Sequence, residues 1–230
     1  NLVDLVDGVH AFDCIEFSAA LRWIDLMSEV GFLLMDMMEN RLDREVWRLL
    51  NAYVEATGDY PGLRVLNFYL VYRALVRAKI ALIRAAQAGA DEAGTRRSDP
   101  AYQAYIGLAE RIVVPRQALI VLMHGLAGSG KTTAAQTLLE CGGAVRVRSD
   151  VERKRLHGLA SGARTHNRPH EGIYAPDSTR RTYERLKIVV CDIIAAGYTA
   201  IVDAAFLQRA PREAFGVLAG ELHVPLKIVS

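Results

Sequence analysis

The sequence is poor in cysteine: its 230 residues include only three, and no two of them form a C-x-x-C pair. Cys14, Cys141 and Cys191 stand in apolar contexts, and an odd number cannot all pair within one chain. The pattern disfavours a secreted scaffold held together by disulfides. We therefore expect a reduced, cytoplasmic protein whose cysteines occupy buried apolar positions.

Long uncharged apolar runs are missing as well. The most apolar stretch, 65–86, is interrupted by Arg73, Arg77 and Arg84, whereas a helix that crosses a bilayer needs about 18 or more apolar residues with few charges. We expect neither a transmembrane helix nor a signal peptide in these residues. The sequence has no starting Met and stops inside an apolar, strand-like run at 226–230, so we expect it to be cut from a longer protein.

A large surplus of one charge is absent too, since the formal net charge is +2. Residues 1–100 hold 11 basic and 15 acidic side chains, whereas residues 101–230 hold 17 basic and 11 acidic ones. We expect the basic half to face phosphate. A surplus of this size, with 7% aromatic residues, favours a nucleotide over a nucleic-acid track.

Hydrophobic periodicity divides the chain near residue 90. Before it, the spacing predicts three helices, the second capped by Asp43, at residues 17–38, 43–53 and 62–88. Residues 87–100, rich in small and polar residues, are the best linker in the chain. We predict a helical part, a linker with a lead-in helix, and a second domain, over 1–90, 91–116 and 117–230. The two halves are expected to be separable.

After the linker, short apolar runs alternate with helical stretches, which is typical of a parallel sheet in an α/β fold. Four strands are predicted, at 118–123, 144–148, 199–204 and 226–229. Four helices are predicted, at 101–112, from Lys131 onward, at 182–196 and at 211–219. The fold class is therefore α/β, with helices flanking the sheet and a mainly helical region before it.

The strongest motif is G-L-A-G-S-G-K-T at 125–132, where the first predicted strand passes into a helix. It matches the Walker A pattern of P-loop NTPases, in which glycines let backbone N–H groups turn toward phosphate oxygens at the positive end of a helix. Lys131 is expected to bridge the β- and γ-phosphates, and Thr132 to ligate Mg²⁺. The predicted ATP-binding residues are Gly125, Leu126, Ala127, Gly128, Ser129, Gly130, Lys131, Thr132 and Thr133. We set aside the alternative, a glycine-rich turn that binds nothing.

A charged segment, R-S-D-V-E-R-K-R at 148–155, follows the second predicted strand. The carboxyl ends of parallel strands open onto the ligand crevice, so Asp150 is placed to accept a proton from an acceptor hydroxyl. Arg153 is placed to neutralise the transferring phosphoryl group. With Lys131 they are the predicted catalytic residues. Alternatively, Ser149 or Asp150 serves only as the N-cap of the following helix.

Asp203 closes the third predicted strand, T-A-I-V-D-A. It resembles the Walker B carboxylate that holds Mg²⁺ directly or through water, so Thr132 and Asp203 are the predicted metal-binding residues. A strand-end Asp that merely begins a turn is the alternative. Arg209 and Arg212 follow in the next loop, where contact with phosphate or acceptor and simple surface solvation are equally consistent with the sequence.

His166 and His170 have H-x3-H spacing in a polar stretch, 158–173. Zinc would need further ligands, and no Cys or carboxylate stands at the expected spacing. We predict no zinc site here and interpret the stretch as a mobile loop on the acceptor side.

Over about 117–230 the sequence resembles small P-loop kinases of the gluconate kinase, polynucleotide kinase and zeta-toxin type. The resemblance rests on the order of strand, P-loop at 125–132, helix and strand, followed by Asp150 and Arg153. It implies phosphoryl transfer from ATP to a small hydroxylated acceptor. It also implies a late lid with arginines and an adenine-contacting segment, which would lie beyond Ser230.

The first half resembles the C-terminal part of an aminoglycoside-phosphotransferase-like kinase domain, through F-D-C-I-E-F, R-W-I-D and V-Y-R-A-L-V-R-A-K. Together the halves are similar to a bacterial fusion of such a domain with a P-loop ATP-binding domain. In the kinase-like fold an Asn and a later Asp bind metal, and Asn1 and Asp13 fit that pattern, while Asp13 fits a plain turn equally well. The remaining kinase groups would precede Asn1, so this chain alone is not expected to perform that chemistry.

We therefore predict an ATP-dependent kinase that uses Mg²⁺, with a small hydroxylated substrate and without a membrane or nucleic-acid partner. The alternative is a regulatory module that binds or slowly hydrolyses nucleotide and has no acceptor. Asp150 separates the two, because only a kinase needs a base on the acceptor side.

Overall fold

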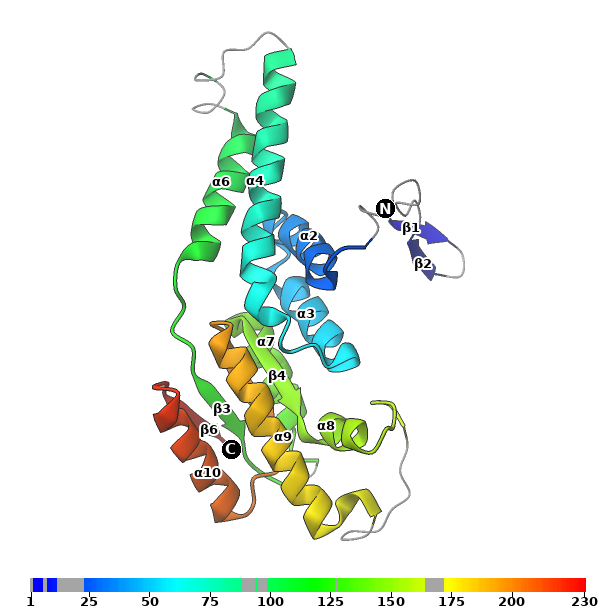
Figure 1. The fold of residues 1–230 in the computed structure, drawn as a ribbon, viewed down its shortest axis with the longest axis vertical. Helices are drawn as coiled ribbons and strands as arrows, with labels where there is room; N and C mark the ends of the chain where they lie inside the picture. Colours follow the sequence, from blue (N-terminus) through cyan, green and yellow to red (C-terminus); the bar gives the residue numbers. More distant parts are fainter. Residues whose placement is uncertain are drawn as a thin grey trace.

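The computed structural model describes residues 2–5, 8–11, 23–87, 94, 99–126, 128–163 and 172–230. Its elements, in chain order, are β1 (Leu2–Leu5), β2 (Gly8–Ala11), α2 (Leu26–Glu39), α3 (Asp43–Thr57), α4 (Leu63–Gln87), α6 (Pro100–Val113), β3 (Ile120–Met123), α7 (Lys131–Gly142), β4 (Ala144–Arg148), α8 (Ser149–Leu156), η1 (Gly172–Tyr174), α9 (Pro176–Ala195), β5 (Thr199–Asp203), α10 (Arg209–Glu221) and β6 (Leu226–Val229). Helices α2 to α6 form one region, here called the helical half, and the elements from β3 onward form the α/β half (Figure 1).

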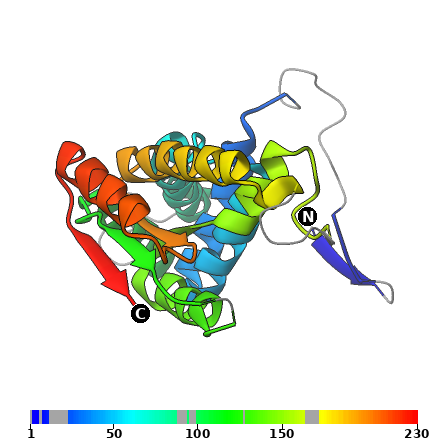
Figure 2. The same ribbon diagram turned by 90° about the horizontal axis from the view of Figure 1, so that it is seen from below.

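The α/β half is built on a parallel sheet of four strands in the order β4-β5-β3-β6. In this register Ile120 of β3 lies opposite Ala200 of β5 and Leu226 of β6. Helices α9 and α10 cover one face of the sheet and α7 covers the other (Figure 2). Strand β3 is buried along its whole length, as a strand covered on both faces must be. The predicted α/β fold, with a parallel sheet and flanking helices, is confirmed.

All four predicted strands are present, and their ends differ from the predictions by at most two residues. The largest difference in this half concerns α9, which begins at Pro176 and not at 182. Its first turn is polar and carries no apolar periodicity, but proline is favourable at the first position of a helix. The sequence pattern therefore missed the start of α9 while the backbone chemistry permitted it.

One helix start and one helix cap in the helical half differ from the sequence predictions. Helix α2 begins at Leu26, because the Asp25 side chain accepts a hydrogen bond from the Met27 backbone N–H at 2.9 Å and caps the helix. Leu42, and not Asp43, is the N-cap of α3, with no side-chain capping bond. A helix from residue 17 is thus wrong for the residues just before Asp25, and residues 12–22 lie outside the described part of the chain.

The first residues also depart from the expected helical pattern. Strands β1 and β2 pair as an antiparallel ladder, with Leu2 opposite Ala11 and Leu5 opposite Gly8. Each segment has only four residues and includes a β-branched valine, which favours an extended backbone. A segment this short carries too few residues to show its periodicity.

Helices α4 and α6 lie side by side and extend away from the sheet (Figure 1). Helix α6 matches the predicted lead-in helix and is capped by Asp99, whose carboxylate accepts from the Tyr102 N–H at 2.8 Å. Most of the predicted linker, 87–100, falls on residues that the structure does not describe. Within the described ranges, no helix has the length and apolar character needed to cross a bilayer.

One apolar core runs through both halves. Helix α3 packs beside α7 and strand β4, and contributes Trp47 and Leu50 to that core. On the same helix Asn51, 4% exposed, donates to the Ala144 carbonyl at 2.9 Å and accepts from the Arg146 N–H at 2.7 Å. The predicted domain boundaries stay a prediction, but these contacts argue against halves that separate freely.

Candidate functional site

The predicted P-loop connects β3 to α7 at the carboxyl edge of the sheet. Gly125, Gly128 and Gly130 have φ angles of 139°, 80° and 84°, a region that side-chain-bearing residues rarely adopt. A Cβ atom at Gly125 would lie 2.9 Å from the Ser129 hydroxyl oxygen. Glycine is therefore required for the tight turn that leads into α7. Ala127, also predicted to bind ATP, lies outside the described residues.

Lys131 is the first residue of α7, and its side chain folds back over the loop. Its amino group donates to the Leu126 carbonyl at 2.5 Å and lies 3.5 Å from the Ser129 hydroxyl oxygen. Thr133 is exposed in the same helical turn. The loop, the ammonium group and the positive end of α7 thus converge, which is the arrangement that binds phosphate.

The two predicted metal-binding residues lie in contact. The Thr132 hydroxyl donates to a carboxylate oxygen of Asp203 at 2.9 Å, although 71 positions separate them in the sequence. Asp203 ends β5 and is 7% exposed. Hydroxyl and carboxylate oxygens are ligands that Mg²⁺ prefers, so the pair fits this ion. The metal-binding role of the pair stays a prediction, and so does the alternative in which Asp203 only begins a turn.

Other metal-binding groups are scarce near the loop. In the parts of the chain that the structure covers, no cluster of three or more His, Cys, Asp or Glu side chains could hold a metal. A cation at Thr132 and Asp203 therefore needs phosphate oxygens and water to complete its coordination. His166 and His170 lie outside the described residues.

Asp150 lies in the first turn of α8, directly after β4. Its carboxylate, 45% exposed, pairs with the Lys154 ammonium at 2.7 Å, and that ammonium also donates to the Ser161 carbonyl at 3.0 Å. Arg148 is the N-cap residue of α8, and no side chain caps the helix. The alternative in which Ser149 or Asp150 caps the helix is thus wrong. The Asp150 carboxylate is accessible from solvent.

Arg153 lies one turn further along α8 and already has partners. One of its terminal nitrogens donates to the Ile173 carbonyl and to the Thr179 hydroxyl, both at 3.0 Å. The guanidinium group also lies 5.1 Å from the centre of the Tyr174 ring, and burial lowers the pKa of Arg153 from its ordinary value. A contact with a phosphoryl group would have to replace these interactions, so the predicted role of Arg153 stays a prediction.

The two arginines after β5 have different surroundings. Arg209 pairs with Glu213 at 2.6 Å, and both side chains are exposed. Arg212 donates to the carbonyls of Phe206 and Leu207 and so holds the loop that follows β5. Surface solvation accounts for Arg209, whereas Arg212 supports the backbone next to Asp203.

Sequence reasoning missed a charged group beside the site. Glu55 of α3 accepts a hydrogen bond from Arg148 at 2.9 Å and lies 3.6 Å from Arg146. The signal was available in A-V-R-V-R at β4, where alternation places both arginines on one face of an otherwise apolar strand. Buried charges of this kind require partners, which here come from the other half of the chain.

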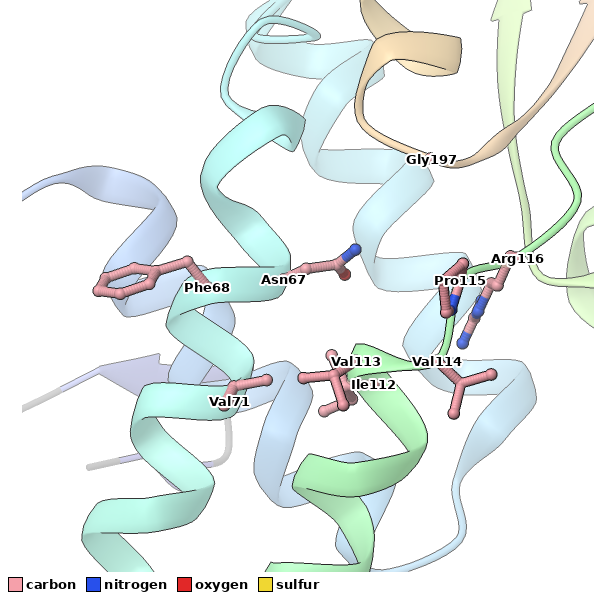
Figure 3. Close-up of a pocket in the computed structure, with 9 residues that line it drawn as sticks. All are labelled: Asn67, Phe68, Val71, Ile112, Val113, Val114, Pro115, Arg116 and Gly197. Atoms are coloured by element: carbon pink, nitrogen blue, oxygen red, sulfur yellow. The ribbon is translucent and has the colours of Figure 1, made fainter.

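A cavity of about 450 Å³ opens elsewhere in the molecule. Figure 3 shows its lining, which is mostly apolar: Asn67, Phe68, Val71, Ile112, Val113, Val114, Pro115, Arg116 and Gly197. Arg116 precedes β3 and Gly197 precedes β5. The cavity therefore lies toward the amino ends of the strands, away from the P-loop, and contains none of the predicted site residues.

The fold and the glycine loop together have the features of a P-loop domain of the α/β class. In agreement, residues 120–230 match the family model AAA_33, described as an AAA domain. The match supports the P-loop part of the resemblance drawn from the sequence. It begins at β3 and does not extend to the helical half.

Longer relatives match nearly the whole chain. The uncharacterized protein Rv2004c of Mycobacterium tuberculosis (strain H37Rv) and the uncharacterized protein Mb2027c of Mycobacterium bovis are each 27% identical to it over 221 residues. The alignment covers 95% of this chain and 43% of each relative, so the chain spans less than half the length of the curated relatives it matches. The aminoglycoside-phosphotransferase resemblance of the first half finds no support among these matches.

Proposed function

We propose that the α/β half is an ATP-dependent kinase that transfers the γ-phosphoryl group of ATP to a hydroxyl group of a small acceptor with the help of Mg²⁺. The observation that carries the proposal is the contact of Thr132 with Asp203 at 2.9 Å, beside a glycine loop at the start of α7. In this proposal the loop would bind the phosphates, and the adjacent Thr132–Asp203 pair would bind the cation. The match of this half to the AAA domain family adds support for nucleotide binding.

The binding step follows from the loop. Backbone N–H groups of 125–132 and the amino end of α7 attract the triphosphate. Lys131 exchanges its bond with the Leu126 carbonyl for a phosphate oxygen and counters the charge that develops on the β- and γ-phosphates. Mg²⁺, when bound, neutralises phosphate charge and fixes the geometry of the triphosphate. Thr132 and Asp203 would hold it.

The acceptor side follows from Asp150. It lies after β4, at the same edge of the sheet as the P-loop, so a hydroxyl group bound there can approach the γ-phosphate while the carboxylate takes its proton. Lys154 pairs with that carboxylate at 2.7 Å and orients it. The bond between the acceptor oxygen and phosphorus forms as the bond to the ADP oxygen breaks.

The proposal is tested by screening acceptors with the full-length protein. Sugars, nucleosides and aminoglycosides are each added to ATP and Mg²⁺, and ADP formation is followed together with the mass of the acceptor. The expected result is ADP formation that depends on one acceptor class, with a phosphorylated product. ADP formation that no acceptor changes would instead support the alternative, a module that binds or slowly hydrolyses nucleotide.

A further inference from the structure

Strand β4 carries two arginines on the face of the sheet that bears the P-loop site. Arg148 lies opposite Asp203 in the pairing of β4 with β5, and facing residues of neighbouring strands project to the same side. Arg146 lies two residues earlier on that side, and one of its terminal nitrogens is 3.5 Å from the Thr132 carbonyl oxygen. Arg146 therefore lies beside Thr132, and Arg148 shares this side of the sheet as the register neighbour of Asp203.

Glu55 provides a carboxylate to both arginines. One of its oxygens accepts from Arg148 at 2.9 Å, and the other lies 3.6 Å from Arg146. The arrangement is largely buried, because the Arg146 side chain is 10% exposed and that of Glu55 is 21% exposed. Among the described residues, the Arg146 Nε atom is buried without a hydrogen-bond partner. Few other groups are thus available to offset the charge of Arg146.

The net charge near Thr132 and Asp203 depends on the Glu55 carboxylate. Two cations close to Thr132 and Asp203 oppose the binding of a divalent cation but favour the binding of a triphosphate, since both effects act through a poorly screened interior. Glu55 offsets one of the two positive charges. It comes from α3, which belongs to the helical half and not to the half that carries the P-loop.

We propose that Glu55 is a positioning residue for the P-loop site: it holds Arg146 and Arg148 beside Thr132 and Asp203 and sets how strongly the site binds Mg²⁺ relative to ATP. The inference rests on the proposed function, because it presupposes that ATP and Mg²⁺ bind at this loop. It gives the helical half a direct electrostatic influence on the nucleotide site.

The test compares the ATP affinity of the whole chain at a series of Mg²⁺ concentrations and in EDTA. In Glu55→Gln the Mg²⁺ concentration needed for half-maximal enhancement of ATP binding should rise about fivefold, while the affinity for ATP in EDTA is retained or increased. If Glu55→Gln only damaged the structure, ATP affinity should fall both with Mg²⁺ and in EDTA. Arg148→Gln should shift the Mg²⁺ requirement in the opposite direction, and combining it with Glu55→Gln should bring the requirement back toward that of the parent.

The matched control is Arg44→Gln. Arg44 lies at the other end of α3 and pairs across the same interface with Glu140 of α7, at 2.8 Å. It should leave the Mg²⁺ requirement unchanged. If Glu55→Gln behaves like Arg44→Gln, or if Arg148→Gln moves the requirement in the same direction as Glu55→Gln, the inference is wrong. If Glu55→Gln does not fold, the direction of the Arg148→Gln shift decides. A parent chain that binds no ATP would overturn the proposed function, and this inference with it.

Discussion

The two halves of the chain use their charged side chains differently. In the α/β half, Lys131, Asp150 and Asp203 lie where strands end and helices begin, at one edge of the sheet. In the helical half, charged residues of α3 and α4 point toward the other half, as in the pairs of Arg44 with Glu140 and of Arg64 with Asp192. In the proposal, the α/β half thus carries the chemistry. The helical half contributes ion pairs that pack against it.

Asp150→Asn is the most direct test of the chemistry proposed for the α/β half. It keeps the shape of the side chain and removes its ability to accept a proton. We expect phosphoryl transfer to fall by about 10³-fold, because general-base catalysis contributes on this order, while ATP affinity stays nearly constant. The measurement is acceptor-dependent ADP formation together with ATP binding.

A matched control for that change exists in α9. Asp177 occupies the same position in the first turn of its helix as Asp150 does in α8, and pairs with Arg180 one turn later. Asp177→Asn should leave transfer unaffected. Full transfer by Asp150→Asn would remove the acceptor-side base from the proposed mechanism.

Lys131→Ala should have the next largest effect. Its ammonium group is expected to contact phosphate, so turnover should fall by about 10²-fold and triphosphate binding should weaken, while the folded structure persists. Lys187→Ala is the control, since Lys187 pairs with Glu184 on the surface of α9. Equal nucleotide affinity in the two variants would contradict the assignment of the P-loop.

Asn51→Ala tests the supporting role of the helical half. The change leaves the Ala144 carbonyl and the Arg146 N–H buried without their partner, and the free energy of unfolding should fall by about 2 kcal/mol. Denaturant unfolding of the whole chain measures it. Asn40→Ala, at the exposed end of α2 where the Asn40 amide donates to the Asp36 carbonyl, should cost less. A loss at Asn51 no larger than at Asn40 would mean that α3 contributes little to the α/β half.

Thr132→Ala should have a smaller effect than Lys131→Ala, and the effect should appear in the Mg²⁺ requirement. One hydroxyl ligand is lost while Asp203 remains, so we expect the Mg²⁺ requirement to rise about tenfold, in line with the loss of a single hydrogen-bonding or ligating group. Thr137→Ala, one turn later in α7, is the control, because its hydroxyl only donates to the Thr133 carbonyl. An unchanged Mg²⁺ titration would show that Thr132 does not hold the metal.

The α/β half was largely predictable because its signals are local. Four short, mainly apolar runs predict the strands. The glycines of the P-loop and the strand-end position of Asp203 predict that the loop and this carboxylate lie at the same edge of the sheet. The polar first turn of α9 has no such signal, and its start was missed. The sequence also did not predict the helix caps. Asp25 and Leu42 take cap positions that depend on how the chain enters each helix.

The contacts between the halves were not predictable in the same way. A sequence shows that Asn51 interrupts the apolar face of its helix, and that Arg146 and Arg148 alternate with valines in a buried strand. It does not show that these residues meet, because about 93 positions separate Asn51 from Ala144 and pairing over that span depends on the packing of whole elements. A polar residue within an apolar pattern indicates that a polar partner is needed, but the pattern does not identify that partner.

The amide of Asn51 also affects the outer edge of the sheet. Strand β4 is an outer strand, and an outer strand exposes backbone groups that can recruit another strand. Asn51 occupies two of these groups on β4, and α3 covers that side. In the described part of the chain the opposite edge is β6. The two hydrogen bonds of Asn51 leave less of the β4 edge available for pairing with a further strand than if Asn51 were absent.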